Sequence, residues 1–139
     1  MKLIPIQPEN ITLAMRDVRG FLESALEYTD GKYNVTDILE HVRSGMQVLW
    51  VVYNEEKEKA IGCLVTEILV YPRTKALLIF LLGGSDFSEI VTILDDLKDY
   101  AIGVGCKSLE LYGRAGWEKI LTPLGFDKTH IVMRANIAV

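Results

Sequence analysis

The sequence contains only two cysteines, Cys63 and Cys106, among its 139 residues. Neither has another cysteine or a histidine at the spacing of a zinc site or of a CxxC pair, and both stand among apolar residues or glycines. We therefore expect two reduced cysteines in the core, with no disulfide and no metal site.

Long apolar runs and an excess of one charge are also missing. The longest apolar run, residues 76–82, is too short to cross a bilayer, and the first ten residues lack the features of a secretory signal. The formal net charge is −4 with 24% charged residues, so no general field attracts nucleic acid or an anionic membrane surface. We expect a cytoplasmic protein that binds neither nucleic acid nor membrane.

Apolar residues, at 50% of the chain, are sufficient for the core of one domain spanning residues 1–139. Their spacing predicts a strand, two helices, three strands, a long helix, a strand, a short helix and a last strand. The expected ranges are 1–6, 8–26, 35–42, 46–53, 60–71, 76–82, 87–103, 108–112, 116–121 and 130–137.

The connections between these elements predict a mixed sheet. A charged turn over residues 54–59 joins two strands as an antiparallel hairpin, and the apolar run 76–82 is typical of a central strand buried on both faces. The strand-helix-strand unit over residues 76–112 should make its two strands parallel. The fold class is therefore α/β (α+β), with Gly83-Gly84 expected to end the central strand and Asn34 or Thr36 expected to cap the second helix.

This order resembles the fold of the GCN5-related N-acetyltransferases (GNAT) over nearly the whole chain. Residues 60–65, with Ile61-Gly62 after a polar turn, look like the third-strand segment of that family, and Leu124-Gly125-Phe126 looks like its Leu-Gly-Phe signature. Residues 113–117 leading into that signature also resemble small GNAT-like proteins of bacteriophages. The resemblance implies a single GNAT-like acyltransferase domain with a mixed central sheet of about six to seven strands and about four helices. The alternative for Leu-Gly-Phe is a glycine at a helix end between two core residues.

The resemblance also implies acetyl-CoA as the cofactor. The family binds the pantetheine arm along the central strand and the pyrophosphate at the start of the long helix, where unpaired N–H groups and the helix dipole favour anions. Here Asp86 and Glu89 look like a capping pair, and the usual phosphate motif of the family is missing, so helix capping is the competing interpretation. The implied cofactor residues are Leu81, Leu82, Gly83, Gly84 and Ser85.

Transfer to an amine needs a base and a group that protonates the departing thiolate. The Tyr position of the family falls on Leu121, so we consider Tyr112 as the acid and Glu67 or Asp86 as the base. The competing interpretations are packing for Tyr112 and a solvent-facing strand position for Glu67. His41 and His130 have no recognisable partner in the sequence.

Arg114, Trp117 and Lys119 stand at the corner that borders the cleft in that family. Arg114 and Trp117 suit a contact with the substrate or with a partner protein. The alternative is that Trp117 covers the core while Arg114 and Lys119 lie at the surface. Trp50, in contrast, is expected in the core.

Three classes of function follow from this sequence. The first is an acyl-CoA-dependent N-acyltransferase acting on a small-molecule or protein amine. The second is a GNAT fold that has lost catalysis and serves as an interaction or structural module, for example of a phage. The third is another α/β sandwich, which regular pairing of residues 82–83 with residues 109–112 would favour over both others. Edge strands at residues 1–6 or 130–137 could also form a homodimer by sheet extension.

Overall fold

The computed structural model describes residues 1–84, 90–113 and 115–138 of the chain. These residues form five strands and four α-helices. The strands are β1 (Lys2–Pro5), β2 (Gln47–Asn54), β3 (Lys59–Val70), β4 (Lys75–Gly84) and β5 (Ser108–Leu111), and the helices are α1 (Ile11–Leu26), α2 (Val35–Arg43), α3 (Ile90–Gly103) and α4 (Ala115–Leu121).

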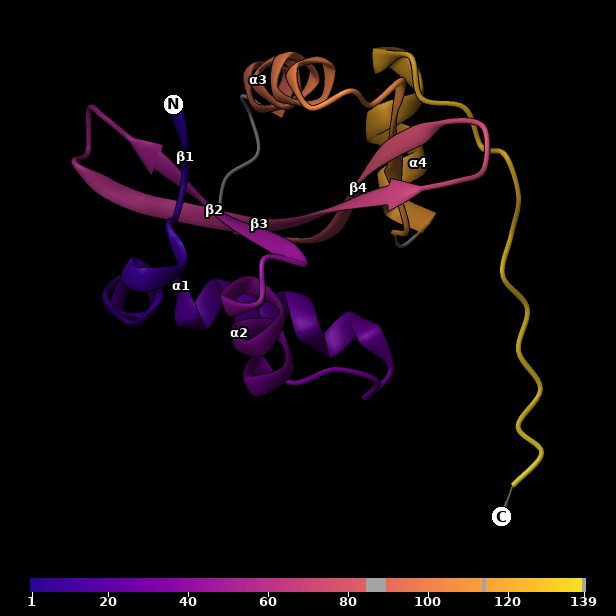
Figure 1. Cartoon of the computed structure of the whole chain (residues 1–139), viewed down its shortest axis with the longest axis horizontal. Helices are drawn as coiled ribbons and strands as arrows, with labels where there is room; N and C mark the ends of the chain where they lie inside the picture. Colours follow the sequence, from indigo (N-terminus) through magenta and orange to yellow (C-terminus); the bar gives the residue numbers. More distant parts are fainter. Residues whose placement is uncertain (85–89, 114, 139) are drawn as a thin grey trace.

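The strands form one sheet in the order β1-β2-β3-β4-β5. The first three pairs are antiparallel and β4 pairs with β5 in parallel, which confirms the mixed sheet and the crossover through α3. Helices α1 and α2 cover one face of the sheet, and α3 and α4 cover the other (Figure 1). The described part of the sheet has five strands, slightly fewer than the six or seven expected.

Two apolar clusters fill the space between the sheet and the two helical layers. The first includes Val18, Leu22 and Ile38 below the sheet, and the second includes Leu97 and Trp50 on the α3 side. Both cysteines are buried and free, one in each cluster. Burial raises the pKa of the Cys63 thiol to about 12, so this thiol is inert at neutral pH.

The local sequence fixes the start of α2. The side chain of Asn34 accepts a hydrogen bond from the Asp37 N–H at 3.0 Å, and the Asp37 carboxylate accepts one from the Asn34 N–H at 2.9 Å. Two otherwise unpaired N–H groups are thereby satisfied, which confirms Asn34 as the cap. None of the helices in the described ranges is long and apolar enough to cross a membrane.

The prediction that Gly83-Gly84 ends the central strand is wrong. β4 runs through both glycines, which pair with Cys63 and Gly62 of β3. A Cβ added at Gly83 would overlap the carbonyl oxygen of Phe21 in α1. Glycine at this position therefore lets α1 lie directly on the strand instead of breaking it.

A β-bulge at Phe80 changes the course of β4. Val65 pairs with Leu81 and Thr66 pairs with Ile79, so Phe80 is the extra residue on β4. A bulged strand bends and twists more strongly. The pairing of β4 with β5 ends at the same place, since Ile79 is the last residue of β4 with a partner on β5.

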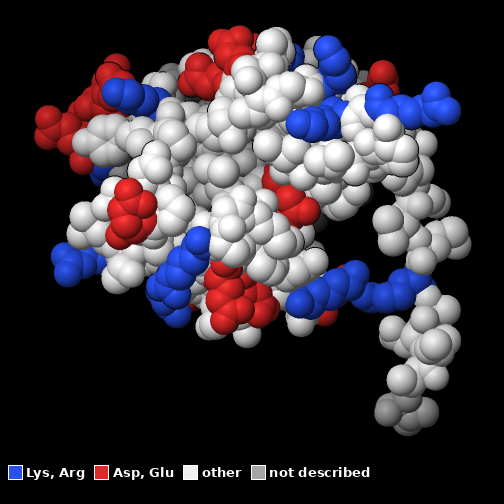
Figure 2. Space-filling view, in the orientation of Figure 1, with Lys and Arg blue, Asp and Glu red and all other residues white. Residues whose placement is uncertain are grey.

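The prediction of a strand over residues 130–137 is also wrong for the single chain. Residues 127–138 are extended outside the sheet and pair with none of the described strands (Figure 1). Figure 2 shows them projecting from a body on which charges of both signs are interspersed. The alternating pattern is that of a strand, but ladder hydrogen bonds require a neighbouring strand, and this segment lies beside none.

Candidate active site

The last five residues of β4 present a backbone edge without a strand partner among the described residues. β4 pairs with β3 from Lys75 to Gly84, but with β5 only from Ala76 to Ile79. The side of residues 80–84 that faces away from β3 therefore lacks the ladder that β5 provides to the first half of the strand. Regular pairing of residues 82–83 with residues 109–112 is absent from the described ladder.

A chain of three polar side chains lies on the α2 side of this sheet. Nε2 of Gln47 donates a hydrogen bond of 2.9 Å to Oε1 of Glu67, and Oε1 of Gln47 lies 3.2 Å from Nδ1 of His41. Gln47 is buried, with 3% of its surface exposed, whereas His41 and Glu67 are half-buried. β2, β3 and α2 each contribute one member of the chain.

The chemistry of Gln47 fixes the direction of these hydrogen bonds. Its amide nitrogen donates to the Glu67 carboxylate, so its oxygen faces His41 and can only accept. Nδ1 of His41 must therefore carry a proton. One oxygen of the Glu67 carboxylate is held by Gln47, and the described hydrogen bonds leave its other oxygen available for a substrate.

Aromatic rings lie on the same side as His41. The ring of Tyr33 packs edge-to-face on Phe80, with centroids 4.9 Å apart and planes at 88°, and edge-on to His41 at 6.4 Å. Phe80 is the bulged residue of β4. The bulge thus places an aromatic ring of the central strand against Tyr33, whose ring also neighbours His41 of the polar chain.

Glu67 and Glu110 belong to one row across the sheet. Gln47 pairs with Glu67, Glu67 with Leu78, and Leu78 with Glu110. Cross-strand partners point to the same face, and Glu110 is two strands from Glu67, which corresponds to about 10 Å.

Tyr112 lies just beyond β5 and is 61% exposed. Its neighbour Tyr71 donates its hydroxyl to both oxygens of Glu110, at 2.9 and 3.1 Å. The hydrogen bond to Glu110 raises the pKa of Tyr71 to about 12, with smaller contributions from burial and from Tyr112. Tyr112 therefore neighbours a tyrosine that holds its proton, and no described hydrogen bond joins it to Glu67.

The implied cofactor residues form one continuous stretch, of which all but Ser85 are described. Leu81 is buried in the first cluster and Leu82 packs against the second, while Gly83 and Gly84 continue the strand. Ser85 lies outside the described residues, as does Asp86. An amide-bearing chain such as pantetheine fits the unpaired backbone of residues 80–84, because it needs donors and acceptors there and no particular side chain.

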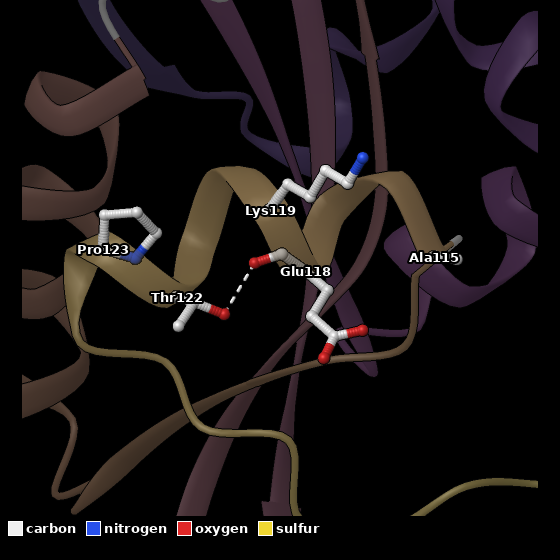
Figure 3. Close-up of a pocket in the computed structure, with 5 residues that line it drawn as sticks. All are labelled: Ala115, Glu118, Lys119, Thr122 and Pro123. Carbon is white, nitrogen blue, oxygen red and sulfur yellow. Dashed lines mark hydrogen bonds between the residues drawn. The ribbon is translucent and has the colours of Figure 1, made fainter.

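The third predicted group is only partly described. Trp117 is half-buried and packs against the second cluster, as its structural interpretation required, and Arg114 lies outside the described residues. Lys119 is exposed on the outer face of α4, beside a hollow of about 660 Å³ that Ala115, Glu118, Thr122 and Pro123 also line (Figure 3).

This hollow does not have the character of a reaction site. The hydroxyl of Thr122 already donates to the Glu118 carbonyl at 2.7 Å, and the lining side chains are exposed. Leu121, where the family has its tyrosine, is buried in the second cluster. The outer face of α4 therefore offers neither an acid nor a base in a sheltered position.

Two sequence interpretations need correction. His41 was expected to lack a partner, but it is half-buried and hydrogen-bonded to Gln47, and Glu67 is half-buried instead of solvent-facing. Gln47 itself escaped prediction. The available signal was that Gln47 directly precedes the apolar run of residues 48–52 within the strand, and a buried amide needs partners.

Comparison with known proteins adds structural relatives only. No family model matches the chain, and no curated protein matches it. Among solved structures, it is similar to an aminoglycoside acetyltransferase from an uncultured soil sample, with a TM-score of 0.72 and 11% identity over 99% of this chain and 98% of the other. It is also similar to a predicted acetyltransferase of Clostridium acetobutylicum, solved with acetyl-CoA, with a TM-score of 0.65 and 14% identity over 97% and 95%.

A third similar structure is glucosamine-6-phosphate N-acetyltransferase from Arabidopsis thaliana, with a TM-score of 0.63 and 18% identity over 99% of this chain and 98% of the other. Identities this low establish the fold and not the activity. The chain has the GNAT fold, as its order of elements predicted.

Proposed function

We propose that this chain, with its GNAT fold, is an acetyl-CoA-dependent N-acetyltransferase that uses Glu67 as the general base toward a primary amine. The observation that carries the proposal is the hydrogen-bonded chain His41–Gln47–Glu67. It lies on the same face of the sheet as the ring of Phe80, the residue at which β4 bulges and beyond which it no longer pairs with β5. The Glu67 carboxylate is positioned by Gln47, which His41 holds in turn, and it keeps one oxygen for a proton.

The backbone of residues 80–84 would hold the cofactor. Their unpaired edge offers N–H and C=O groups to the amides of pantetheine, in the manner of an added strand. Bound acetyl-CoA would supply the acetyl group as an activated thioester. The bend at Phe80 would keep this edge clear of β5.

Glu67 would accept the proton that an ammonium substrate must lose before its nitrogen can attack a carbonyl carbon. Gln47 would hold the carboxylate in position, and its own amide cannot rotate freely because His41 fixes its other end. Tyr112, exposed at the end of β5, would supply a proton to the departing sulfur.

The substrate class is proposed from the walls of the site and from two relatives. Tyr33 and Phe80 present aromatic surface, and a protonated amine is attracted both by aromatic faces and by the Glu67 carboxylate. One similar structure is an aminoglycoside acetyltransferase in complex with sisomicin, and another is a glucosamine-6-phosphate N-acetyltransferase. Amino sugars are therefore the first amines to test.

A second candidate is a GNAT fold that no longer catalyses and acts as an interaction or structural module. The observation in its favour is Leu121, which stands where the family has its acid and is buried in the core. Under this proposal Tyr112 is a surface residue, and Glu67 serves only to anchor Gln47.

One experiment separates the two candidates. We would measure acetyl-CoA binding by calorimetry, with desulfo-CoA as a control, and then acetyl transfer to a panel of amino sugars and peptide amines. Binding with turnover that Glu67→Gln abolishes would support the enzyme, provided that Asp95→Asn, an exposed carboxylate change on α3, retains full activity. Absence of acetyl-CoA binding at millimolar ligand would overturn the enzyme proposal.

A further inference from the structure

The C-terminal segment, residues 130–138, carries apolar side chains that its own chain leaves uncovered. Among them, Ile131 is 65% exposed, Met133 is 84% exposed and Ile137 is 96% exposed. Exposed apolar side chains are common singly, but a row of them on an extended segment marks an interaction surface. Covering these side chains requires a second apolar surface.

The side chains of this segment alternate as in a strand with one buried face. Ile131, Met133, Ala135 and Ile137 form one row, while His130, Arg134 and Asn136 stand with Val132 in the other. Successive side chains of an extended chain point to opposite faces, so the first row is wholly apolar.

The sheet offers one matching edge. β5 pairs with β4 on one side, and none of the described strands pairs with its other side. Leu109 and Leu111 of β5 pack toward the second apolar cluster, while Glu110 lies on the opposite face. An added strand whose apolar row continues this cluster places its polar row on the Glu110 face.

The charges agree with this arrangement. Arg134 belongs to the polar row and would share a face with the Glu110 carboxylate. Opposite charges on neighbouring strands favour pairing. The apolar match and the charge match therefore select the same orientation of the segment's two faces.

Within its own chain, the segment is held by weak contacts. Among the described residues, Arg134 of the segment forms an ion pair with Asp30 at 3.4 Å, and Lys128, just before the segment, forms one with Glu118 at 3.9 Å. All four side chains are more than half exposed. Exposed pairs of this kind contribute little. The segment extends away from the sheet of its own chain, past β4, into open solvent (Figures 1 and 2).

We propose that residues 130–137 of one chain pair with the outer edge of β5 in a second copy, and that the two copies exchange these segments reciprocally. The same two surfaces then meet twice around a two-fold axis, which closes the assembly as a dimer. The exchange covers the apolar row and occupies the open edge of each sheet.

The mass in solution provides the first test. Light scattering on the eluting protein should give twice the 15.6 kDa of the single chain. Met133→Asp should raise the dimer dissociation constant at least about a hundredfold, because each copy would bury a charge in an apolar row. Asn136→Asp adds the same charge to the polar row of the same segment and should change the dissociation constant by less than about tenfold.

Hydrogen exchange identifies the surfaces that meet. In the dimer, amides of residues 131–137 and of β5 should be protected together, and Met133→Asp should remove both protections at dilutions where it is monomeric. A monomer would overturn the proposal, whether its segment is protected by its own β5 or unprotected. A dimer in which the β5 amides exchange as fast as in Met133→Asp would overturn it as well.

Discussion

Thr66 and Glu67 are neighbours on β3, yet their side chains lie on opposite faces of the sheet and in different polar environments. On the α3 side, the Thr66 hydroxyl accepts a 2.9 Å hydrogen bond from the indole N–H of Trp50, and both residues are buried. On the α2 side, Glu67 is half-buried and receives a hydrogen bond from Gln47, which His41 holds in turn. The first pair is shut off inside the core, whereas the second ends on a carboxylate whose other oxygen takes part in no hydrogen bond among the described residues.

This difference separates a stabilising polar contact from one suited to chemistry. A donor–acceptor pair buried on both sides is satisfied within the core and is not exposed to a substrate. A carboxylate oriented by a buried amide retains capacity, and a substrate can use it. Substitutions on the two sides should therefore affect different quantities, stability on one and activity on the other.

The largest effect is expected on the Glu67 side. Glu67→Gln keeps the shape of the side chain and an oxygen that accepts from Gln47, so the fold should be retained. If Glu67 is the base, kcat/KM for acetyl transfer should fall by about 10² to 10⁴, the usual contribution of such a group. Retention of kcat/KM within about tenfold would show that Glu67 is not the base.

A substitution that disturbs the same layer without touching the polar chain sharpens the comparison. Gly83→Ala forces α1 away from β4, because the new methyl overlaps the Phe21 carbonyl. The free energy of unfolding should fall by about 1–3 kcal/mol. Gly20→Ala, also on α1, is the matched control, since its new methyl has no atom within 4 Å. Because alanine favours helix over glycine, this substitution should leave the free energy of unfolding unchanged or raise it. Urea unfolding followed by tryptophan fluorescence measures both.

On the closed side, Thr66→Val should reduce stability and leave the activity of the folded protein unchanged. Valine has a similar shape but cannot accept the Trp50 N–H, which would remain buried and unpaired at a cost of about 1–3 kcal/mol. Thr66→Ser retains the acceptor and should lose less. A drop in kcat comparable to that of Glu67→Gln would contradict the separation of the two sides.

The smallest effect concerns Tyr71 and Glu110, farther along the Glu67 row. The neutral phenol donates to the carboxylate, and its ionisation would break that bond and bring two negative charges together, which is why its pKa is about 12 instead of 10.0. Because the folded value is raised, this contribution to stability is present below pH 10 and is lost as the pH rises toward 12. Glu110→Gln should return the pKa toward 10.0 in an ultraviolet titration that uses Tyr71→Phe for subtraction. An unchanged pKa would show that Glu110 is not its cause.

The sequence predicted the elements with a strong local pattern. The stripe that starts at Ile11, the cap at Asn34 and the crossover from β4 to β5 are all confirmed, because helical spacing, capping chemistry and connection rules act over short distances. This order, together with the Ile61-Gly62 segment and Leu124-Gly125-Phe126, predicted the GNAT fold.

The site was less accessible for two physical reasons. In the polar chain, His41 is six positions from Gln47, and Gln47 is twenty positions from Glu67. The register of β2 on β3 brings Gln47 and Glu67 together. The last predicted strand has the correct alternation, but pairing also needs a partner edge, about which the segment itself says nothing. The bulge was hidden because an apolar run reads the same with or without one additional residue.

Phe80 is one additional residue in β4, and it shifts the alternation of side chains between the two faces of the sheet by one position. Ile79 and Leu81 would share a face in a regular strand, yet they enter opposite clusters because Phe80 lies between them as an additional residue. A chain with Phe80 deleted would keep both on their present sides, and it would lose the bend together with the ring that packs on Tyr33. The bend of the central strand thus depends on one residue, Phe80, whereas the division of Ile79 and Leu81 between the two clusters does not.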